Sequence, residues 1–352
     1  MTALKTVILG AIALTAVVSV SSNASAADFY AGKSLEFLVA AAAGGGYDLP
    51  ARAIARYIGK HVPGHPTVVV KNMSGANGLI MTNFLYNVAA RDGTVMGMTS
   101  NSAPFEPLVR LVSPDGKNIQ FDARKLQWIG TPTKETYVAF VWHQSPAKSF
   151  EDLKKSKILM GSTSTAGPNG VLPTLTNEFV GTTMQVVTGY GSQTNIFLAL
   201  ERGELHGNVT GLTNLTVNKA DWMRDGKALV LVQYRIAKDR NLPDVPLILD
   251  LIQNEDDKAA MRFALSQFEM ARPIATPPDV PAERVQILRA AFDATMQDDV
   301  FLEDTKKLGL DIDPMSGPEI GALIEEMYKT PKPIVDRVRS AILDSDRRQG
   351  AK

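Results

Sequence analysis

One stretch constrains the fold more than any other: SLEFLVAAAAGGGYDLPARAIARYIGKHV, residues 34–62. Its first six residues are mostly apolar and predict a short buried strand. After three glycines, apolar residues at Ala51, Ile54 and Ile58 have the spacing of an amphipathic helix, with Asp48 placed as its N-cap. Because glycine carries a backbone-entropy cost, three in succession indicate a loop whose backbone must approach something closely.

The same succession of strand, loop and helix recurs along the chain. PTVVVKNM at 66–73 leads into SGANG and a helical pattern, and TVMGMTS at 94–100 ends in a polar loop. From Trp128 the pattern starts again, and KILMGSTSTAGPNG at 157–170 repeats the first unit in kind. Alternating strands and helices predict an α/β fold whose mostly parallel sheets are covered by helices on both faces.

The C-terminal part of the chain has helical patterns and no further strand pattern, so we expect it to pack on the sheet of the first half. We predict two lobes, with residues 27–131 and 236–352 in lobe 1 and residues 132–235 in lobe 2. The chain would then cross between the lobes near 128–135 and again near 232–245.

Loops at the carboxyl ends of these strands are the predicted ligand site. In open α/β sheets ligands bind beyond these ends, where a helix N-terminus offers unpaired N–H groups and partial positive charge. Two such loops, one from each lobe, would clamp a carboxylate through backbone N–H groups and hydroxyls. The predicted ligand-binding residues of lobe 1 are Ala42, Ala43, Gly44, Gly45, Gly46, Tyr47, Asn101 and Ser102. Those of lobe 2 are Ser162, Thr163, Ser164, Thr165, Ala166, Tyr190 and Gly191.

Several of these residues allow a second interpretation. Each loop alone fits a tight strand-to-helix turn with a polar cap, and it is their matched position in two halves that favours binding. Tyr190 could instead be a partly buried ring with a satisfied hydroxyl. Arg272 could pair with a second carboxylate of the ligand or, more ordinarily, with Glu269 three residues earlier.

Other chemistries lack their sequence patterns. The glycines are not followed by GK[ST], and the GxGxxG spacing of a dinucleotide site is missing. The sequence has no GxSxG nucleophile elbow, no HExxH pair and no cysteine. We therefore predict no metal, no cofactor and no catalytic residue. The alternative, an exported serine hydrolase using Ser162 or Ser164, would need His143 or His206 beside that serine.

Charge and the N-terminus indicate where the protein works. Lys plus Arg and Asp plus Glu number 37 each, so nothing suggests a nucleic acid partner. Residues 1–26 combine a basic Lys5, a short apolar stretch and the small-residue sequence ASA, which is the pattern of a cleaved signal peptide. We expect a periplasmic protein whose mature chain begins near Ala27.

Several motifs, in one order, resemble the receptors of tripartite tricarboxylate transporters, also called Bug receptors. AAAGGGYDLPAR at 41–52 is similar to their first-lobe loop, and VVVKNMSGANG at 68–78 to the strand and turn that follow. MGSTSTAGPNG at 160–170 and VTGYGSQTNIFLALERGELHG at 187–207 resemble the second-lobe loops. The resemblance covers nearly the whole mature chain.

The resemblance implies a type II periplasmic binding fold with a ligand cleft between two α/β lobes. It implies a monomeric receptor that closes on a small organic carboxylate, either a di- or tricarboxylate or an aromatic acid, and delivers it to the permease subunits of a membrane transporter. In the family the carboxylate is held largely by backbone amides and ordered waters. A sensory receptor for the same ligand class is an alternative. The chain departs from the family at Ala41, Tyr47, Pro168 and Asn169, all in the predicted pocket.

Overall fold

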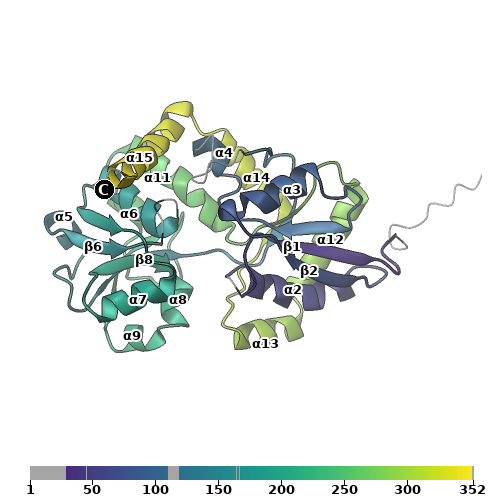
Figure 1. Cartoon of the computed structure of the whole chain (residues 1–352), viewed down its shortest axis with the longest axis horizontal. Coiled ribbons are helices and arrows are strands. Elements are labelled where there is room, and N and C mark those ends of the chain that lie inside the picture. The colour runs from purple at the N-terminus through teal and green to yellow at the C-terminus, as the bar shows by residue number, and fades with distance from the viewer. Residues whose placement is uncertain (1–28, 45, 110–118, 164, 166, 351–352) are drawn as a thin grey trace, which may run out of the picture.

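The computed structural model describes residues 29–44, 46–109, 119–163, 165 and 167–350. The predicted signal peptide, and with it Gly45, Ser164 and Ala166 of the predicted site, lies outside the described residues. In the described part, two sheets are each flanked by helices and stand side by side, as Figure 1 shows. This arrangement confirms the predicted α/β class with two lobes.

The first sheet contains β1 (Ser34–Val39), β2 (Thr67–Asn72), β3 (Val95–Met98), β4 (Gln127–Thr131), β10 (Ile274–Thr276) and β11 (Met315–Ser316). The helical segments of this part of the chain are α2 (Asp48–His61), η1 (Ala76–Gly78), α3 (Leu79–Asn87) and α4 (Glu106–Val109), followed much later by α12 (Ala282–Met296), α13 (Asp299–Lys307) and α14 (Gly317–Tyr328). The strand order is β11-β4-β10-β3-β1-β2.

This first sheet is mixed, whereas we predicted a mostly parallel one. β1 pairs in parallel with β2 and β3, but β10 runs antiparallel between β3 and β4. The expectation that the C-terminal part adds no strand was also wrong, because β10 and β11 both come from it. β10 and β11 are three and two residues long, too short to show an alternation of apolar and polar residues.

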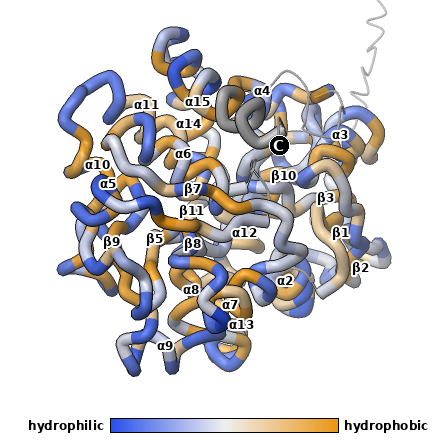
Figure 2. The backbone as a smooth tube through the Cα atoms, turned by 60° about the vertical axis from the view of Figure 1, so that its left-hand side comes forward, coloured by the Kyte–Doolittle hydropathy of each residue, from blue (hydrophilic) through white to orange (hydrophobic). Residues whose placement is uncertain are grey.

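The alternation of side chains along β1 builds a core on each face of the sheet. Leu35, Phe37 and Val39 are buried in one cluster with Ile54 of α2, and Leu38 is buried in another cluster with residues of α3. In Figure 2 the strands are largely hydrophobic and many outer turns are hydrophilic. Burial on both faces fixes where β1 ends, and therefore where the glycine loop begins.

The second sheet contains β5 (Tyr137–Trp142), β6 (Ile158–Gly161), β7 (Met184–Val187), β8 (Gly207–Gly211) and β9 (Ala228–Tyr234), in the order β7-β6-β8-β5-β9. Its part of the chain forms the helices α5 (Asp152–Lys155), α6 (Pro168–Val180), α7 (Gln193–Glu201), α8 (Leu212–Thr216) and α9 (Ala220–Arg224). The segments α10 (Ile248–Leu251), α11 (Glu255–Ser266) and η2 (Gln267–Glu269) follow β9. β6 pairs in parallel with β7 and β8, and β5 is antiparallel to both of its neighbours.

Two connecting segments join the sheets. The first runs from β4 to β5, and the second leads from η2 into β10. They are hydrogen-bonded to each other, with Glu135 N–H donating to the Phe268 carbonyl at 3.0 Å and Ala271 N–H to the Thr133 carbonyl at 3.2 Å. We call these two paired segments, residues 132–136 and 270–273, the hinge, because they lead from one sheet to the other.

The chain returns to the first sheet at β10. After β9 the chain stays beside the second sheet, since α10 contacts β9 and α11 contacts α6. The buried side chain of Gln233 explains part of this path: its amide nitrogen donates to the carbonyls of Leu242 (2.9 Å) and Val245 (2.7 Å). The division of the chain into lobes at 131 and 235 stays a prediction.

The C-terminal helices divide between the two sheets. As predicted, α12, α13 and α14 return to the first sheet and its helices. The last helix, α15 (Lys332–Gly350), packs mainly on α11 and α6, and Figure 1 shows it above the second sheet. It also reaches α4, where Arg339 donates to the Leu108 carbonyl at 2.6 Å. The last helix therefore contacts elements of both sheets.

Candidate functional site

The glycine loop between β1 and α2 is held by Asp48. The Asp48 carboxylate accepts hydrogen bonds from Gly44 N–H (2.8 Å), Arg52 Nε (2.9 Å) and Asn72 Nδ2 (2.8 Å). The hydrogen bond from Arg52 is the main reason that the pKa of this buried carboxyl falls to about 2. Asp48 is thus not the predicted N-cap: α2 begins at this residue, and the carboxylate is turned back onto the loop.

The loop after β3 meets the glycine loop through Tyr47. The Tyr47 hydroxyl donates to Asn101 Oδ1 (3.2 Å) and accepts from Asn101 N–H (3.3 Å). Burial of the ring raises the pKa of this hydroxyl. Next to it, Ser102 Oγ lies 3.0 Å from Ser100 Oγ and accepts from Asn77 Nδ2, also at 3.0 Å. The structure therefore brings Tyr47, Asn101 and Ser102 together at one end of the first lobe, as predicted.

Asn77 is a polar residue of this region that the sequence reasoning did not select. Its backbone is left-handed, with φ 52° and ψ 36°, a conformation that asparagine tolerates better than most residues. The Asn-Gly pair within SGANG was a usable signal for such a turn.

A cavity lies where the two lobes meet. Lobe 1 contributes Asn77, Asn101 and Ser102 to its lining, and the start of α6 contributes Gly167 and Pro168. The cavity is thus formed by loops at the carboxyl ends of strands in both sheets, which is where α/β proteins bind ligands. It joins two of the predicted residues of lobe 1 to the loop that follows β6.

The loop after β6 is held by neutral hydrogen bonds. Ser162 is fully buried, donates from Oγ to Asn169 Oδ1 at 2.9 Å and uses its N–H for the Val187 carbonyl at 2.8 Å. Thr163 Oγ1 lies 3.4 Å from Asn169 Oδ1. Asn208, also fully buried, donates to the Gly161 carbonyl at 2.6 Å.

The remaining predicted residues differ in exposure. Tyr190 is half-buried against the core cluster around Phe197 and Trp222. Thr165 is half-buried as well. The exposed residues of the predicted set are Ala42, Ala43, Gly44, Gly46, Thr163 and Gly191.

Arg272 connects the hinge to the glycine loop. Its Nε donates to the Gly46 carbonyl at 3.0 Å, and its Nη1 lies 3.6 Å from Glu135 Oε2. The expected partner Glu269 was wrong, because the Glu269 carboxylate lies 3.7 Å from Arg235 instead. Burial raises the pKa of Glu135, and Arg272 opposes that rise. Sequence spacing gave no signal for this ion pair, since its two partners come from different hinge segments.

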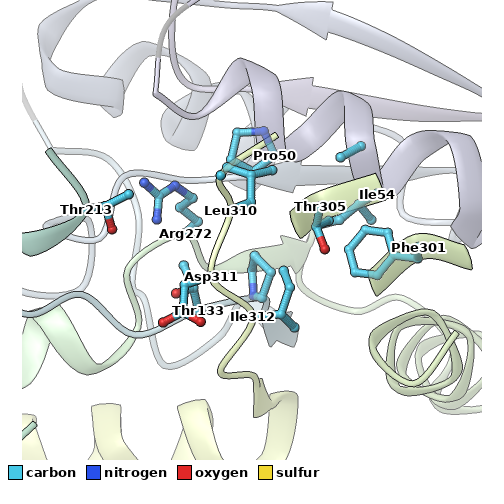
Figure 3. Close-up of a pocket in the computed structure, with 13 residues that line it drawn as sticks. Pro50, Ile54, Thr133, Thr213, Arg272, Phe301, Thr305, Leu310, Asp311 and Ile312 are labelled. Atoms are coloured by element: carbon cyan, nitrogen blue, oxygen red, sulfur yellow. The ribbon is translucent and has the colours of Figure 1, made fainter. Parts of the chain in front are cut away.

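A second, narrow hollow lies beside Arg272 between α2 and α13 (Figure 3). Pro50 and Ile54 come from α2, and Phe301 and Thr305 from α13. We call it the side crevice. At one end of the crevice the Arg272 guanidinium points toward Thr213 of lobe 2.

Two other kinds of site are absent from the described residues. No helix in this part of the chain has both the length and the apolar composition needed to cross a bilayer. Nor does any group of three or more histidine and acidic side chains there have an arrangement that could hold a metal ion.

Comparison with known proteins decides the family. The model of the tripartite tricarboxylate transporter family receptor matches residues 51–339. The chain belongs to this family. The resemblance stated from the motifs is thereby confirmed, and the family is one of periplasmic solute receptors and not of enzymes.

Solved structures show the same fold at low identity. A solute-binding protein of this family from Polaromonas has 17% identity and a TM-score of 0.67, with 88% of this chain and 99% of that chain covered. A Rhodopseudomonas palustris protein with adipate has 16% identity and a TM-score of 0.62 over 87% of this chain and 97% of that one. MatC from the same organism, with bound malate, has 17% identity and a TM-score of 0.58 over 88% and 99%. A comparison with curated proteins found no match.

Proposed function

We propose that this receptor captures a small organic carboxylate in the cleft between its lobes and delivers it to the permease subunits of a tripartite transporter. The observation that carries the proposal is the cavity between the lobes, whose lining includes strand-end loops of both sheets. A ligand that contacts both lobes stabilises the closed arrangement over the open one, since only the closed form makes both sets of contacts. The exported, processed chain would do this as a monomer in the periplasm.

Two similar structures support the carboxylate as ligand class. The proteins solved with adipate and with malate share the fold of this chain over most of their length. Loops of the present chain have the matching chemistry, with exposed glycine backbone at Gly46 and with hydroxyl or amide side chains at Asn101 and Ser102 in the cavity lining.

The hydrolase alternative has less support in the described residues. Ser162 Oγ donates to the side-chain carbonyl of Asn169, which cannot act as a general base. His206 accepts the Leu159 N–H on Nδ1, at the opposite end of β6 from Ser162. The triad that a hydrolase requires is therefore not assembled around Ser162 in this arrangement.

Thermal unfolding of the mature protein with a set of organic acids tests the proposal. Acetate, hexanoate, adipate, malate, citrate and benzoate would be compared with neutral amides of the same carbon skeletons. At one hundred times its Kd, a bound acid raises the free energy of unfolding by about 2.7 kcal/mol, and the amides are expected to give no shift. Absence of a shift with every acid would contradict a carboxylate receptor. Uptake of the bound acid would then be compared between cells with and without this receptor. Loss of uptake without the receptor indicates transport, and unchanged uptake indicates sensing.

A further inference from the structure

We propose that Tyr47 is a positioning residue, whose hydroxyl orients the side-chain amide of Asn101 so that its N–H groups donate to the ligand carboxylate. The inference rests on the proposed function and adds to it the pair of residues that presents a hydrogen-bond donor. Asn101 lines the cavity between the lobes, whereas Tyr47 lies beside Asn101 and would act through it. Asn101 would therefore touch the ligand, and Tyr47 would decide which end of its amide does so.

The Tyr47 ring is held in place from two sides. It packs on the core cluster that contains Ile54 of α2, and the guanidinium of Arg272 lies 6.0 Å from the centre of the ring. A tyrosine side chain has only two torsions, so a ring that is packed in this way leaves its hydroxyl oxygen at one position. That position is next to Asn101, in the loop after β3.

The hydrogen bonds of this hydroxyl determine the orientation of the Asn101 amide. A backbone N–H can only donate, so the Tyr47 oxygen accepts from Asn101 N–H, at 3.3 Å. The single proton of the hydroxyl is then available for Asn101 Oδ1, which lies 3.2 Å away. If the amide were turned over, its nitrogen would face the hydroxyl and the Tyr47 proton would lose this acceptor, which costs free energy. Tyr47 therefore favours the orientation with Oδ1 toward itself.

The nitrogen of the same amide is left with two unused donors. None of the described residues accepts a hydrogen bond from Asn101 Nδ2, and with Oδ1 turned toward Tyr47 the nitrogen is directed away from the ring. Its neighbours in the cavity lining are bonded to each other, since Asn77 Nδ2 donates to Ser102 Oγ at 3.0 Å. Asn101 Nδ2 is thus the donor in this part of the lining that is available to a ligand.

A ligand carboxylate in this cavity would have to be bound by neutral donors. The described residues of the lining include one charged side chain, Glu106, and an ionised carboxylate has no proton to donate. Hydrogen bonds to an ionised acceptor are stronger than those between neutral groups, so the two N–H groups of one amide can distinguish a carboxylate from a neutral ligand. An amide in the opposite orientation would present its carbonyl oxygen and repel the carboxylate.

Isothermal titration of adipate, malate and benzoate into the mature protein tests the contact. Asn101→Ala removes the donor and is expected to weaken the tightest-binding of these acids at least about tenfold. Unchanged affinity in this variant would overturn the inference while leaving the carboxylate receptor intact. If neither these acids nor the others of the thermal unfolding test bind the natural protein, the proposed function itself has failed.

A double-mutant cycle tests the positioning role of Tyr47. Tyr47→Phe keeps the ring and removes the hydroxyl, so the Asn101 amide is no longer held in one orientation, and affinity for the acid is expected to fall about threefold to tenfold. Added to Asn101→Ala, the same substitution is expected to have no further effect, because no amide remains to be oriented. Equal losses in both backgrounds would show that the hydroxyl acts on the loop as a whole, and the positioning role would be wrong. Tyr57→Phe, which removes a hydroxyl of α2 bonded to Asp304, is the matched control and should leave affinity unchanged.

Asn101→Asp reverses the chemistry of the atom that faces the ligand. One carboxylate oxygen can still accept from the Tyr47 hydroxyl, so the loop keeps its arrangement, while the other oxygen replaces the Nδ2 donor. Affinity for the acid is expected to fall at least about tenfold below that of Asn101→Ala, because like-charge repulsion is added to the lost hydrogen bond. Equal affinities in the two variants would contradict a ligand carboxylate beside Nδ2.

Discussion

The glycine loop of lobe 1 and the loop after β6 of lobe 2 each follow a parallel strand and lead into a helix, but they are held by different interactions. The glycine loop of lobe 1 is fixed by a carboxylate with an arginine partner, Asp48 with Arg52, and by Arg272 from the hinge. The loop after β6 is fixed by hydrogen bonds between neutral groups of its own lobe, chiefly Ser162 with Asn169. Charged hydrogen bonds are about twice as strong as neutral ones and depend on pH.

Because of this difference, we expect the two loops to respond differently to pH and to substitutions. The shape of the glycine loop depends on protonation and on the hinge, because Arg272 contacts both Gly46 and Glu135. The loop after β6 depends on neither. Substitutions around the first loop should therefore change stability, ligand affinity and pH response together, whereas substitutions in the second should have small and local effects.

Asp48→Ala is expected to have the largest effect. It leaves Gly44 N–H, Arg52 and Asn72 without their shared acceptor, and the free energy of unfolding is expected to fall by about 2 to 3 kcal/mol. Urea unfolding of the mature protein measures the change. The control is Glu326→Ala, which removes an exposed ion pair with Lys329 and should cost less than about 0.5 kcal/mol. Similar losses in both variants would mean that the Asp48 network does not organise the loop.

Arg272→Lys tests the connection between the hinge and the glycine loop. Lysine keeps the charge but loses the planar group that reaches the Gly46 carbonyl and Glu135 at the same time. Because a peptide is planar, holding the Gly46 carbonyl toward the hinge also directs Tyr47 N–H the opposite way. We expect the affinity for the best-bound acid to fall about tenfold with little change in melting temperature. The control is Arg240→Lys, at an exposed arginine. Equal affinities in the two variants would show that Arg272 does not contribute to ligand binding.

Local patterns were enough to predict most of this fold and the position of the cleft. The apolar run of β1, the three glycines and the periodicity of α2 are contiguous, so a sequence without any alignment shows them. Tyr47, Asn101 and Ser102 followed from the rule that loops at one edge of a sheet converge. Ligand contact by any predicted residue stays a prediction.

What the sequence could not show depends on pairs that are distant in the chain. Glu135 with Arg272 and Arg235 with Glu269 are such pairs, and neither has a spacing that points to its partner. The role of Asp48 was misjudged for a different reason: an acidic residue at a helix start is usually a cap, and only the fold brings Asn72 and Gly44 within reach of its carboxylate. The side crevice is lined partly by α13, which packs on α2 although the two helices are far apart in the sequence.

The pH dependence of stability gives a sharper test of the charged loop. The pKa of Asp48 is about 2 in the folded protein and near its ordinary value of 3.8 in the unfolded chain. The ionised carboxylate therefore stabilises the fold above about pH 4, and this contribution is lost as the pH falls toward 2. The difference in free energy of unfolding between the natural protein and Asp48→Asn is expected to shrink by about 1 kcal/mol from pH 5 to pH 2.5. Other acids are common to both proteins and cancel. A constant difference would show that the charge of Asp48 is not what holds the loop.

Ser162→Ala is expected to have the smallest effect and tests the other side of the comparison. The substitution removes one neutral hydrogen bond to Asn169, so the free energy of unfolding should fall by only about 0.5 to 1 kcal/mol, with no dependence on pH. Because both Ser162 N–H and its hydroxyl already have partners within lobe 2, affinity for the best-bound acid should change less than about threefold. Titration of the acid into the variant measures this. A large loss of affinity would mean that Ser162 turns toward the ligand on closure, and the second loop would then contribute side chains to binding as directly as the first contributes backbone.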